Sequence, residues 1–293
     1  MEGLSVDLFW AGLITSGLAS AAYVIFAFGS RVTYGAADTG AGTVTIPIVQ
    51  RSPQSFGIAG SFFATATALL LLLSLVARVI AAERPPYTNL WEFTVAFAFG
   101  VTVAYLAFER WYGQRSLGVF TLPLAFGLLL VSALFFPAEI NPLVPALQAN
   151  RILAFHVGMM ITAYSALSVS FAAGVMYLVQ GGKRRFKTLP KAALLEEIGY
   201  RSVLVGFPLL AFGIALGAWW ANDAWGRPWG WDPKETSALV TWLIYAGYLH
   251  MRGLKGWKGA RSAWMLCIGY GAVLFTYFGV NLWISGLHSY SGV

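Results

Sequence analysis

The chain has 293 residues, of which 58% are hydrophobic and only 11% are charged. Soluble domains carry roughly 25% charged residues, so this composition excludes an ordinary soluble protein and indicates an integral membrane protein. The net charge of +7 would also suit a nucleic-acid-binding protein. The basic residues, however, gather between apolar segments, which indicates membrane topology and no nucleic-acid partner.

Apolar segments of about 20 residues recur along the chain without the alternation typical of barrel strands. They predict an all-α membrane protein with one polytopic domain over residues 1–293 and about eight transmembrane helices. The acidic start, Met1-Glu-Gly-Leu-Ser-Val-Asp7, is unlike a signal peptide, so we expect the first span to be retained. The expected spans are 8–29, 57–81, 91–108, 118–136, 153–180, 202–221, 236–251 and 262–287.

Two connections, 182–200 and 252–261, are strongly basic, and the positive-inside rule predicts that both face the cytoplasm. Under this topology 14 of the 19 Lys and Arg residues lie inside. Both termini and the loops 82–90, 137–152 and 222–235 are then outside a bacterial cytoplasmic membrane. Residues 30–55 form a long inner connection, and residues 188–199 are predicted to form a short interfacial helix.

Five tryptophans stand between residues 219 and 231, namely Trp219, Trp220, Trp225, Trp229 and Trp231. Gly226, Pro228, Gly230 and Pro233 exclude a continuous helix through this stretch. Tryptophans at a membrane interface are usually belt residues, an interpretation that suits Trp10, Trp111 and Trp283. It does not explain the density here. We therefore predict that the segment 222–235, called the Trp-rich loop below, is a platform for a large flat ligand.

The three histidines occupy informative positions. His156 begins the fifth span and His288 ends the eighth, so both are expected on the same outer side as the Trp-rich loop. A single histidine at a helix end is more often a structural hydrogen-bonding group. Two imidazoles beside an aromatic platform, however, match the axial ligands of a bis-histidine haem.

His250 is predicted near the inner end of the seventh span. It lies roughly 20 Å of helix away from Glu235, so it cannot share an iron with the outer pair. It is either a second haem ligand or a solvated residue at headgroup level. Met159 and Met160 follow His156 at helical spacing, where they either offer a thioether ligand or pack in the bundle.

Charged residues of the Trp-rich loop are further candidates. Arg227 and Lys234 either pair with haem propionates or are solvent-exposed loop charges. Asp232 before Pro233 is a natural turn residue, and Glu235 opens the seventh span; both carboxylates could also orient a histidine or an arginine. The single Cys267 lies in an apolar run and is interpreted as a structural thiol.

The stretch Trp225-Gly-Arg-Pro-Trp-Gly-Trp-Asp-Pro-Lys-Glu-Thr236 resembles the WWD motif of the haem-handling proteins of cytochrome c maturation. Together with Trp242 and Tyr248-Leu-His250, it is most similar to the CcsA family of the system II branch, also catalogued as CcsB or ResC. Three further segments match in order, and the similarity covers about residues 60–293. They are Asn89-Leu-Trp-Glu92, Leu147 through His156-Val-Gly-Met-Met160, and Gly286-Leu-His288-Ser-Tyr290. Arg227-Pro228 and Ser291 before Gly292 depart slightly from the family pattern.

The resemblance implies that His156 and His288 hold haem b at the outer WWD site. It also implies that His250 belongs to an inner membrane site and that haem arrives from the cytoplasmic side. The activity implied is that of a haem lyase acting in a complex, which attaches haem to the CxxCH motif of apocytochrome c. The implied partners are a CcsB/ResB-type membrane subunit and a thioredoxin-like thiol reductant. Because one chain supplies only one membrane histidine, we expect that subunit to supply a second one.

Two other classes compete with this interpretation. One is a system I type haem-handling protein, which shares the tryptophan loop but differs in length and flanking sequence. The other is a haem-binding electron-transfer subunit, which would need four histidines paired inside the bundle. A secondary transporter would show broken helices and buried charge at mid-membrane, whereas the irregular charged stretch here is expected at the surface.

Overall fold

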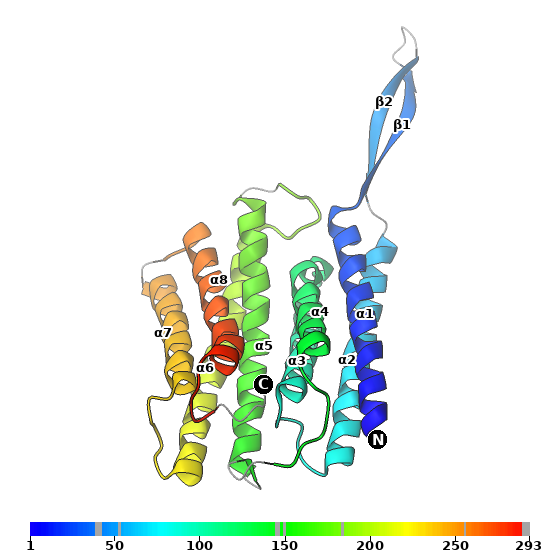
Figure 1. Ribbon diagram of the computed structural model, residues 1–293. Helices are drawn as coiled ribbons and strands as arrows, with labels where there is room; N and C mark the ends of the chain where they lie inside the picture. The colour runs from blue at the N-terminus through cyan, green and yellow to red at the C-terminus, as the bar shows by residue number, and fades with distance from the viewer. Residues whose placement is uncertain are drawn as a thin grey trace.

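The computed structural model describes residues 1–38, 43–51, 54–143, 147–148, 151–182, 185–254 and 256–288. Within these ranges eight long helices run alongside one another and reverse direction at each connection (Figure 1). They are α1 (Glu2–Phe28), α2 (Gln54–Ala82), α3 (Leu90–Tyr112), α4 (Gly118–Phe135), α5 (Arg151–Gln180), α6 (Ala192–Trp225), α7 (Pro233–Leu254) and α8 (Ala260–Leu274). The all-α membrane bundle predicted from the sequence is confirmed.

Short elements complete the described chain. An antiparallel hairpin, β1 (Ser30–Asp38) and β2 (Thr43–Arg51), follows α1, with Ser30 opposite Arg51 in register. A 3₁₀ turn, η1 (Arg115–Leu117), leads into α4. After α8 the helix widens into a π-helical segment, η3 (Phe275–Gly279), and closes with α9 (Val280–Trp283). The hairpin projects from one end of the bundle (Figure 1).

Seven of the described helices are long and apolar enough to cross a membrane, with η1–α4 and α8–α9 each counted as one. The remaining expected span, 236–251, corresponds to α7, which is 22 residues long but less apolar. Charged residues stand at both of its ends, with Lys234 and Glu235 at the start and Arg252 at the finish. Because α7 packs beside α6 and α8, the bundle still has eight long members.

One boundary prediction is wrong. Residues 188–199 do not form a separate interfacial helix, because α6 is continuous from Ala192 to Trp225. Trp219, Trp220 and Trp225 are therefore helical, and the irregular part of the Trp-rich loop is confined to residues 226–232. The helix ends at Gly226, which adopts the left-handed conformation (φ 71°) that favours glycine after a helix.

The end of the bundle opposite the hairpin is fastened by a buried charge network. Arg78 of α2 is fully buried, and its Nε donates to the Glu92 carboxylate of α3 at 2.9 Å. Arg84 donates to the other Glu92 oxygen at 3.0 Å. Asn89 caps the start of α3 by accepting from the Glu92 backbone N–H. This network holds the first turn of α3 in place, where Phe93 and Phe97 follow.

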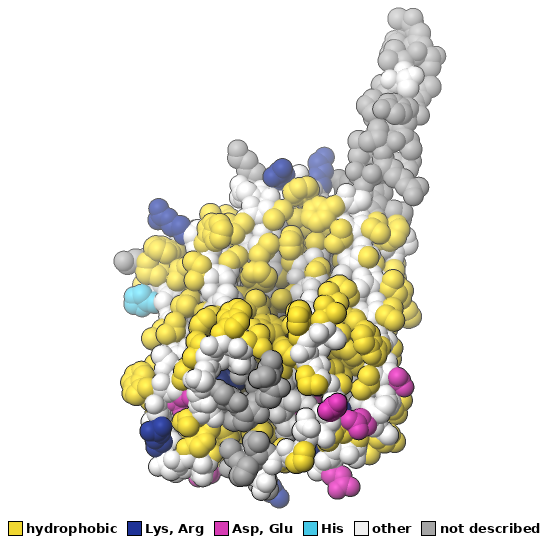
Figure 2. Space-filling model, viewed as in Figure 1, with side chains coloured by type: hydrophobic (Ala, Val, Ile, Leu, Met, Phe, Trp, Pro, Cys, Tyr) yellow, Lys and Arg dark blue, Asp and Glu magenta, His cyan; other side chains and the backbone are white. Residues whose placement is uncertain are grey.

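The bundle surface divides into zones in the face drawn in Figure 2. Hydrophobic side chains surround its middle, whereas acidic side chains gather toward the end opposite the hairpin. That end also carries the N-terminus and the α2–α3, α4–α5 and α6–α7 connections (Figure 1). An apolar waist between polar ends is the pattern of a multi-pass membrane protein.

Candidate functional site

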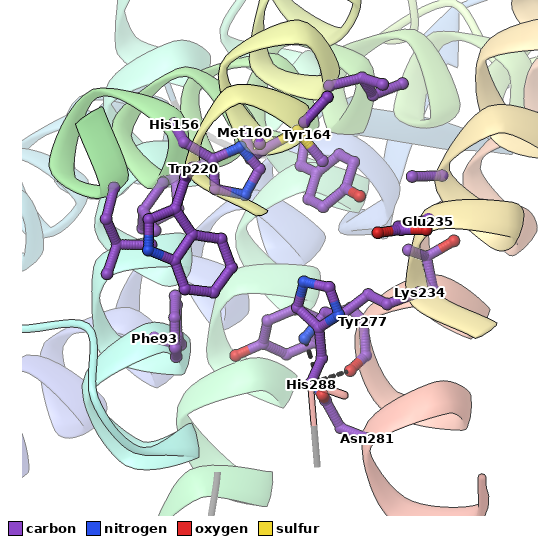
Figure 3. Close-up of a pocket in the computed structure, with 18 of the residues that line it drawn as sticks. Phe93, His156, Met160, Tyr164, Trp220, Lys234, Glu235, Tyr277, Asn281 and His288 are labelled. Atoms are coloured by element: carbon purple, nitrogen blue, oxygen red, sulfur yellow. Dashed lines mark hydrogen bonds between the residues drawn. The ribbon is translucent and has the colours of Figure 1, made fainter. Parts of the chain in front are cut away.

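A cavity lies at the end of the bundle that carries the Trp-rich loop. Its empty volume is about 1130 Å³, open space at its mouth included. The lining is mostly apolar and aromatic, and His156 and His288 both contribute to it (Figure 3). Its further members include Phe93, Phe97, Met160, Tyr164, Trp220, Trp229, Lys234, Glu235, Tyr277 and Asn281.

His156 enters the cavity from the second turn of α5. Its Nδ1 lies 2.7 Å from the backbone carbonyl oxygen of Gly213 on α6. A carbonyl oxygen only accepts hydrogen bonds, so Nδ1 carries the proton and donates. The lone pair of the neutral ring is therefore on Nε2, the nitrogen available to a metal.

Small residues on α6 make room for this histidine. A Cβ added at Gly217 would lie 2.7 Å from His156 Cε1, and one at Gly213 would lie 2.7 Å from Met160 Sδ. A larger side chain at Gly217 would displace the His156 ring, and one at Gly213 would displace the Met160 side chain. Close approach of two helices through small residues is a common packing device in membranes. It presses the His156 ring against the backbone of α6.

His288 enters the same cavity from the irregular segment after α9. Its Nδ1 lies 2.8 Å from Asp232 Oδ2. The second oxygen, Asp232 Oδ1, accepts from the Leu287 backbone N–H at 2.6 Å. An ionised carboxylate only accepts, so His288 also presents Nε2 as its metal-binding nitrogen.

Besides its contacts with His288 and Leu287, Asp232 caps the start of α7. Its Oδ2 accepts from the Lys234 backbone N–H at 3.0 Å, and Glu235 reaches back to accept from the Asp232 N–H at 3.1 Å. This is a capping box with Pro233 in the first helical position. Burial raises the pKa of Asp232, but its bonds to His288 and to the Lys234 and Leu287 amides outweigh burial and lower the pKa below its usual value.

The tryptophans of the Trp-rich segment separate into three groups. Trp220, only 1% exposed, and Trp229 line the cavity. Trp225 packs against the His288 ring with its centroid 4.9 Å away and the planes at 76°. Trp219 and Trp231 are 60% and 70% exposed and lie outside the lining. Of the three tryptophans within the predicted platform 222–235, which are Trp225, Trp229 and Trp231, only Trp229 lines the cavity itself.

The predicted cationic partners also separate. Lys234 lines the cavity, and its Nζ donates to Asn281 Oδ1 at 2.7 Å. Arg227 is exposed on the loop and is absent from the lining. Glu235 lines the cavity, but its carboxylate is engaged with the Gly230 and Asp232 amides. Among the charged side chains of the loop, Lys234 is therefore the cation that the cavity receives.

The remaining candidates lie apart or play lesser parts. His250 is exposed near the far end of α7, well away from the cavity. Met160 lines the cavity and Met159 does not. Cys267 is half-buried in α8, and burial among apolar neighbours suits a structural thiol. The expected motif residues Ser289 and Tyr290, with Ser291 and Gly292, fall outside the described residues.

Several lining residues escaped the sequence interpretation. Trp220 was noted only as a member of the aromatic run, although it reaches the cavity from α6, and Tyr164, Tyr277 and Asn281 carried no prediction within their spans. Tyr277 shares a 2.7 Å hydrogen bond with Thr94 of α3, which joins the last helix to α3. A polar side chain such as Asn281 inside an apolar span is the one signal that pointed to them.

Fold and site together define a class of molecule: a multi-pass membrane bundle that ends in an aromatic cavity with two histidines facing it through Nε2. The model of the cytochrome c assembly protein family matches residues 39–288 of this chain. The chain belongs to that family, and the resemblance seen in its sequence is confirmed.

Similar proteins extend over most of the chain. The cytochrome c biogenesis protein CcsA of Synechococcus sp. strain JA-3-3Ab is 36% identical over 85% of this chain and 89% of its own length. The protein of the same name from Thermosynechococcus vestitus is 36% identical over 74% of this chain and 82% of its own. That from Mesostigma viride is 35% identical over 81% and 86%, respectively.

A solved structure shares the fold. The cytochrome c haem lyase CcmF superimposes with a TM-score of 0.63 at 19% identity and covers 94% of this chain. The chain spans 46% of the length of that structure. The two proteins therefore share a fold over most of this chain, and the solved protein is about twice as long.

Proposed function

We propose that this chain is a haem-handling protein of system II cytochrome c biogenesis. It holds haem b at the outer face of a bacterial cytoplasmic membrane and presents it for covalent attachment to the CxxCH motif of apocytochrome c. One observation carries the proposal: two histidines line one aromatic cavity, and each has its Nδ1 held by an acceptor. Membership of the family and the names of the CcsA relatives support it.

The donor set fits haem as a substrate. Nε2 atoms of His156 and His288 suit the axial positions of iron, and Trp220 and Trp229 offer aromatic surface to the porphyrin. Lys234 offers a cation to a propionate, and Arg227 remains a candidate for the second propionate from outside the lining. The apolar remainder of the lining excludes water from the macrocycle.

The reaction itself needs positioning more than acid–base chemistry. Each cysteine S–H of the client adds across one haem vinyl group, so that sulfur bonds to one carbon and hydrogen to the other. The client thiols must be reduced, a task we assign to a thioredoxin-like partner. A cavity that fixes the porphyrin plane and the iron together supplies the alignment that such an addition requires.

His250 belongs to a separate inner site in this proposal. Its exposure on α7 supports a haem ligand shared with another subunit, of the CcsB/ResB type, which would contribute the second imidazole. The His250→Ala variant of the complex should lose one bis-histidine haem spectrum and keep the other. Retention of both spectra would rule out the inner site.

The outer site is tested by purifying the protein and recording its reduced and oxidised absorption spectra. We expect a six-coordinate bis-histidine haem in the wild type and loss of that signature in the double variant His156→Ala/His288→Ala. The Trp219→Ala variant is the control, because it removes an exposed aromatic side chain that does not line the cavity. Holocytochrome c formation that persists in the double variant would refute the proposal.

A further inference from the structure

The two histidines of the cavity lie on different kinds of backbone, one helical and one irregular. His156 lies within a helix and its ring is pressed against α6, where even a methyl group at Gly217 would meet Cε1 at 2.7 Å. His288 follows the last helix, in a segment of irregular backbone whose residues 284–287 are all exposed. One ligand is built into the bundle wall, whereas the other lies on a peripheral segment.

Asp232 is the group that fastens this segment to the Trp-rich loop. Its two carboxylate oxygens accept from the Leu287 backbone N–H and from His288 Nδ1, at 2.6 and 2.8 Å. The backbone approaches so closely that a Cβ at Gly286 would lie 2.5 Å from Asp232 Oδ1. Asp232 is itself held by the capping box of α7, and it is only 5% exposed.

The two faces of a haem in this cavity would therefore meet ligands that are held differently. On one side the His156 ring lies against the backbone of α6, within the helical bundle. On the other side His288 lies on a segment whose residues 284–287 are exposed and which the Asp232 contacts join to the Trp-rich loop. A client histidine has to reach one face of the iron while its two thiols reach the haem edge.

We propose that Asp232 is a positioning residue that clasps His288 in its metal-binding tautomer, and that His288 is the axial ligand replaced by the client histidine while His156 keeps the iron. This inference rests on the proposed function. The exchange is balanced: the bond from iron to His288 Nε2 breaks and one to the client imidazole forms. The iron keeps its oxidation state, and the Nδ1 proton of His288 stays where it is.

The clasp is tested with Asp232→Asn, which keeps the shape of the side chain. Its amide offers an N–H where either His288 or Leu287 needs an acceptor, so one of the two contacts is lost. Loss of an outer partner weakens a metal–histidine bond by about 10–100-fold. We expect the ferric spectrum to shift from six-coordinate low-spin toward five-coordinate high-spin, with haem retained on His156.

A second readout needs no haem. Hydrogen exchange at the Leu287 amide should be slow in the wild type and faster in Asp232→Asn. Asp223→Asn is the matched control, since it removes an exposed carboxylate at the end of α6 that does not line the cavity. Unchanged spectrum and exchange in Asp232→Asn would overturn the clasp.

The identity of the leaving ligand is tested with His156→Gly and His288→Gly, each loaded with haem. Free imidazole should restore a six-coordinate spectrum in both variants, which shows that each still holds haem. The probe is a peptide bearing the client motif with both cysteines replaced by serine, so that its histidine can bind without forming thioethers. It should restore the spectrum in His288→Gly and leave His156→Gly five-coordinate.

Restoration by the peptide in His156→Gly, in both variants or in neither would overturn the assignment of His288. A wild-type protein that binds no haem would instead refute the proposed function. The two failures are therefore distinguishable.

Discussion

Lys234 is the residue whose placement depends most on the fold around it. An amine at the wall of an apolar cavity costs free energy unless it meets a partner, and the partner here is the neutral oxygen of Asn281. Asp232 is close in sequence, but its oxygens serve His288 and the Lys234 and Leu287 amides. The cavity therefore carries a cation suited to an anionic group of its ligand.

We expect Lys234→Met to weaken haem binding by about tenfold to a hundredfold, since a hydrogen bond to a charged group contributes about 1.5–3 kcal/mol. Titration of haem into the detergent-solubilised protein measures the effect. Arg151→Gln is the control, because Arg151 is an exposed cation at the same end of the bundle that does not line the cavity. An equal loss of haem affinity in both variants would mean that Lys234 acts only through the overall positive charge of this end of the bundle.

At the scale of residues, the sequence predicted which residue types line the cavity better than it predicted their individual contacts. The predictions that named His156, His288 and Lys234 followed from residue type and side of the membrane, and all three line one cavity. Whether they bind haem stays a prediction. Trp231, expected on the platform, is exposed, whereas Trp220, expected within the sixth span, lines the cavity because the last turns of α6 turn it inward. In a short aromatic run, the sequence does not distinguish inward-facing from exposed tryptophans until the end of the helix is known.

At the scale of elements, the site depends on the packing of α5 against α6. Gly213 and Gly217 face α5 one helical turn apart, and between them they admit Met160 and the His156 ring. The carbonyl of Gly213 is free to accept from His156 only because the two backbones lie this close. The contact thus sets both the position and the tautomer of the histidine.

We expect Gly217→Ala to displace the His156 ring and abolish the six-coordinate haem spectrum, because the new Cβ would lie 2.7 Å from Cε1. Gly158→Ala on α5 makes the same chemical change at a position with no atom within 4 Å. That control should keep the spectrum and match or exceed wild-type thermal stability, since alanine favours a helix by about 1 kcal/mol over glycine. A normal spectrum in Gly217→Ala would show that α6 tolerates a wider spacing.

Element boundaries were the weaker part of the sequence interpretation. Helix α6 is continuous from Ala192 to Trp225. No proline breaks its first turns, and Pro208 lies within the helix without ending it. Apolar length alone located the spans, but the polar turns that extend a helix beyond the membrane carry no such signal. The sequence interpretation left residues 30–55 as a connection, although Thr43-Val-Thr-Ile-Pro-Ile-Val49 is rich in the β-branched residues that favour strands.

At the scale of the whole molecule, charge divides the two ends of the bundle. The α5–α6 and α7–α8 connections, whose described residues include Arg185, Lys187, Lys191 and Lys258, lie at the same end as the hairpin (Figure 1). The Trp-rich loop and the cavity lie at the other end, where the acidic side chains gather in Figure 2. The positive-inside rule then predicts that the cavity opens to the outside.

Single cysteines test this orientation in a Cys267→Ala background. In intact cells a membrane-impermeant maleimide should label Arg227→Cys, and it should label Lys187→Cys only after the membrane is opened. Both positions lie outside the apolar waist, so accessibility reports the side of the membrane. The reverse labelling pattern would place the cavity on the cytoplasmic face and end the proposal of an outer site.

The π-helical turn at Phe275–Gly279 gives the last helix one residue more than a regular α-helix would hold over the same rise. Thr276 and Tyr277 of this turn and Asn281 beyond it all border the cavity. Because the extra residue is absorbed within this turn, the helix beyond it keeps the orientation of a regular helix. Inserting one residue between the turn and Asn281 would instead rotate by about 100° both the amide that accepts from Lys234 and the irregular segment that bears His288. Variants of this helix therefore have to preserve the spacing of its residues as well as their identity.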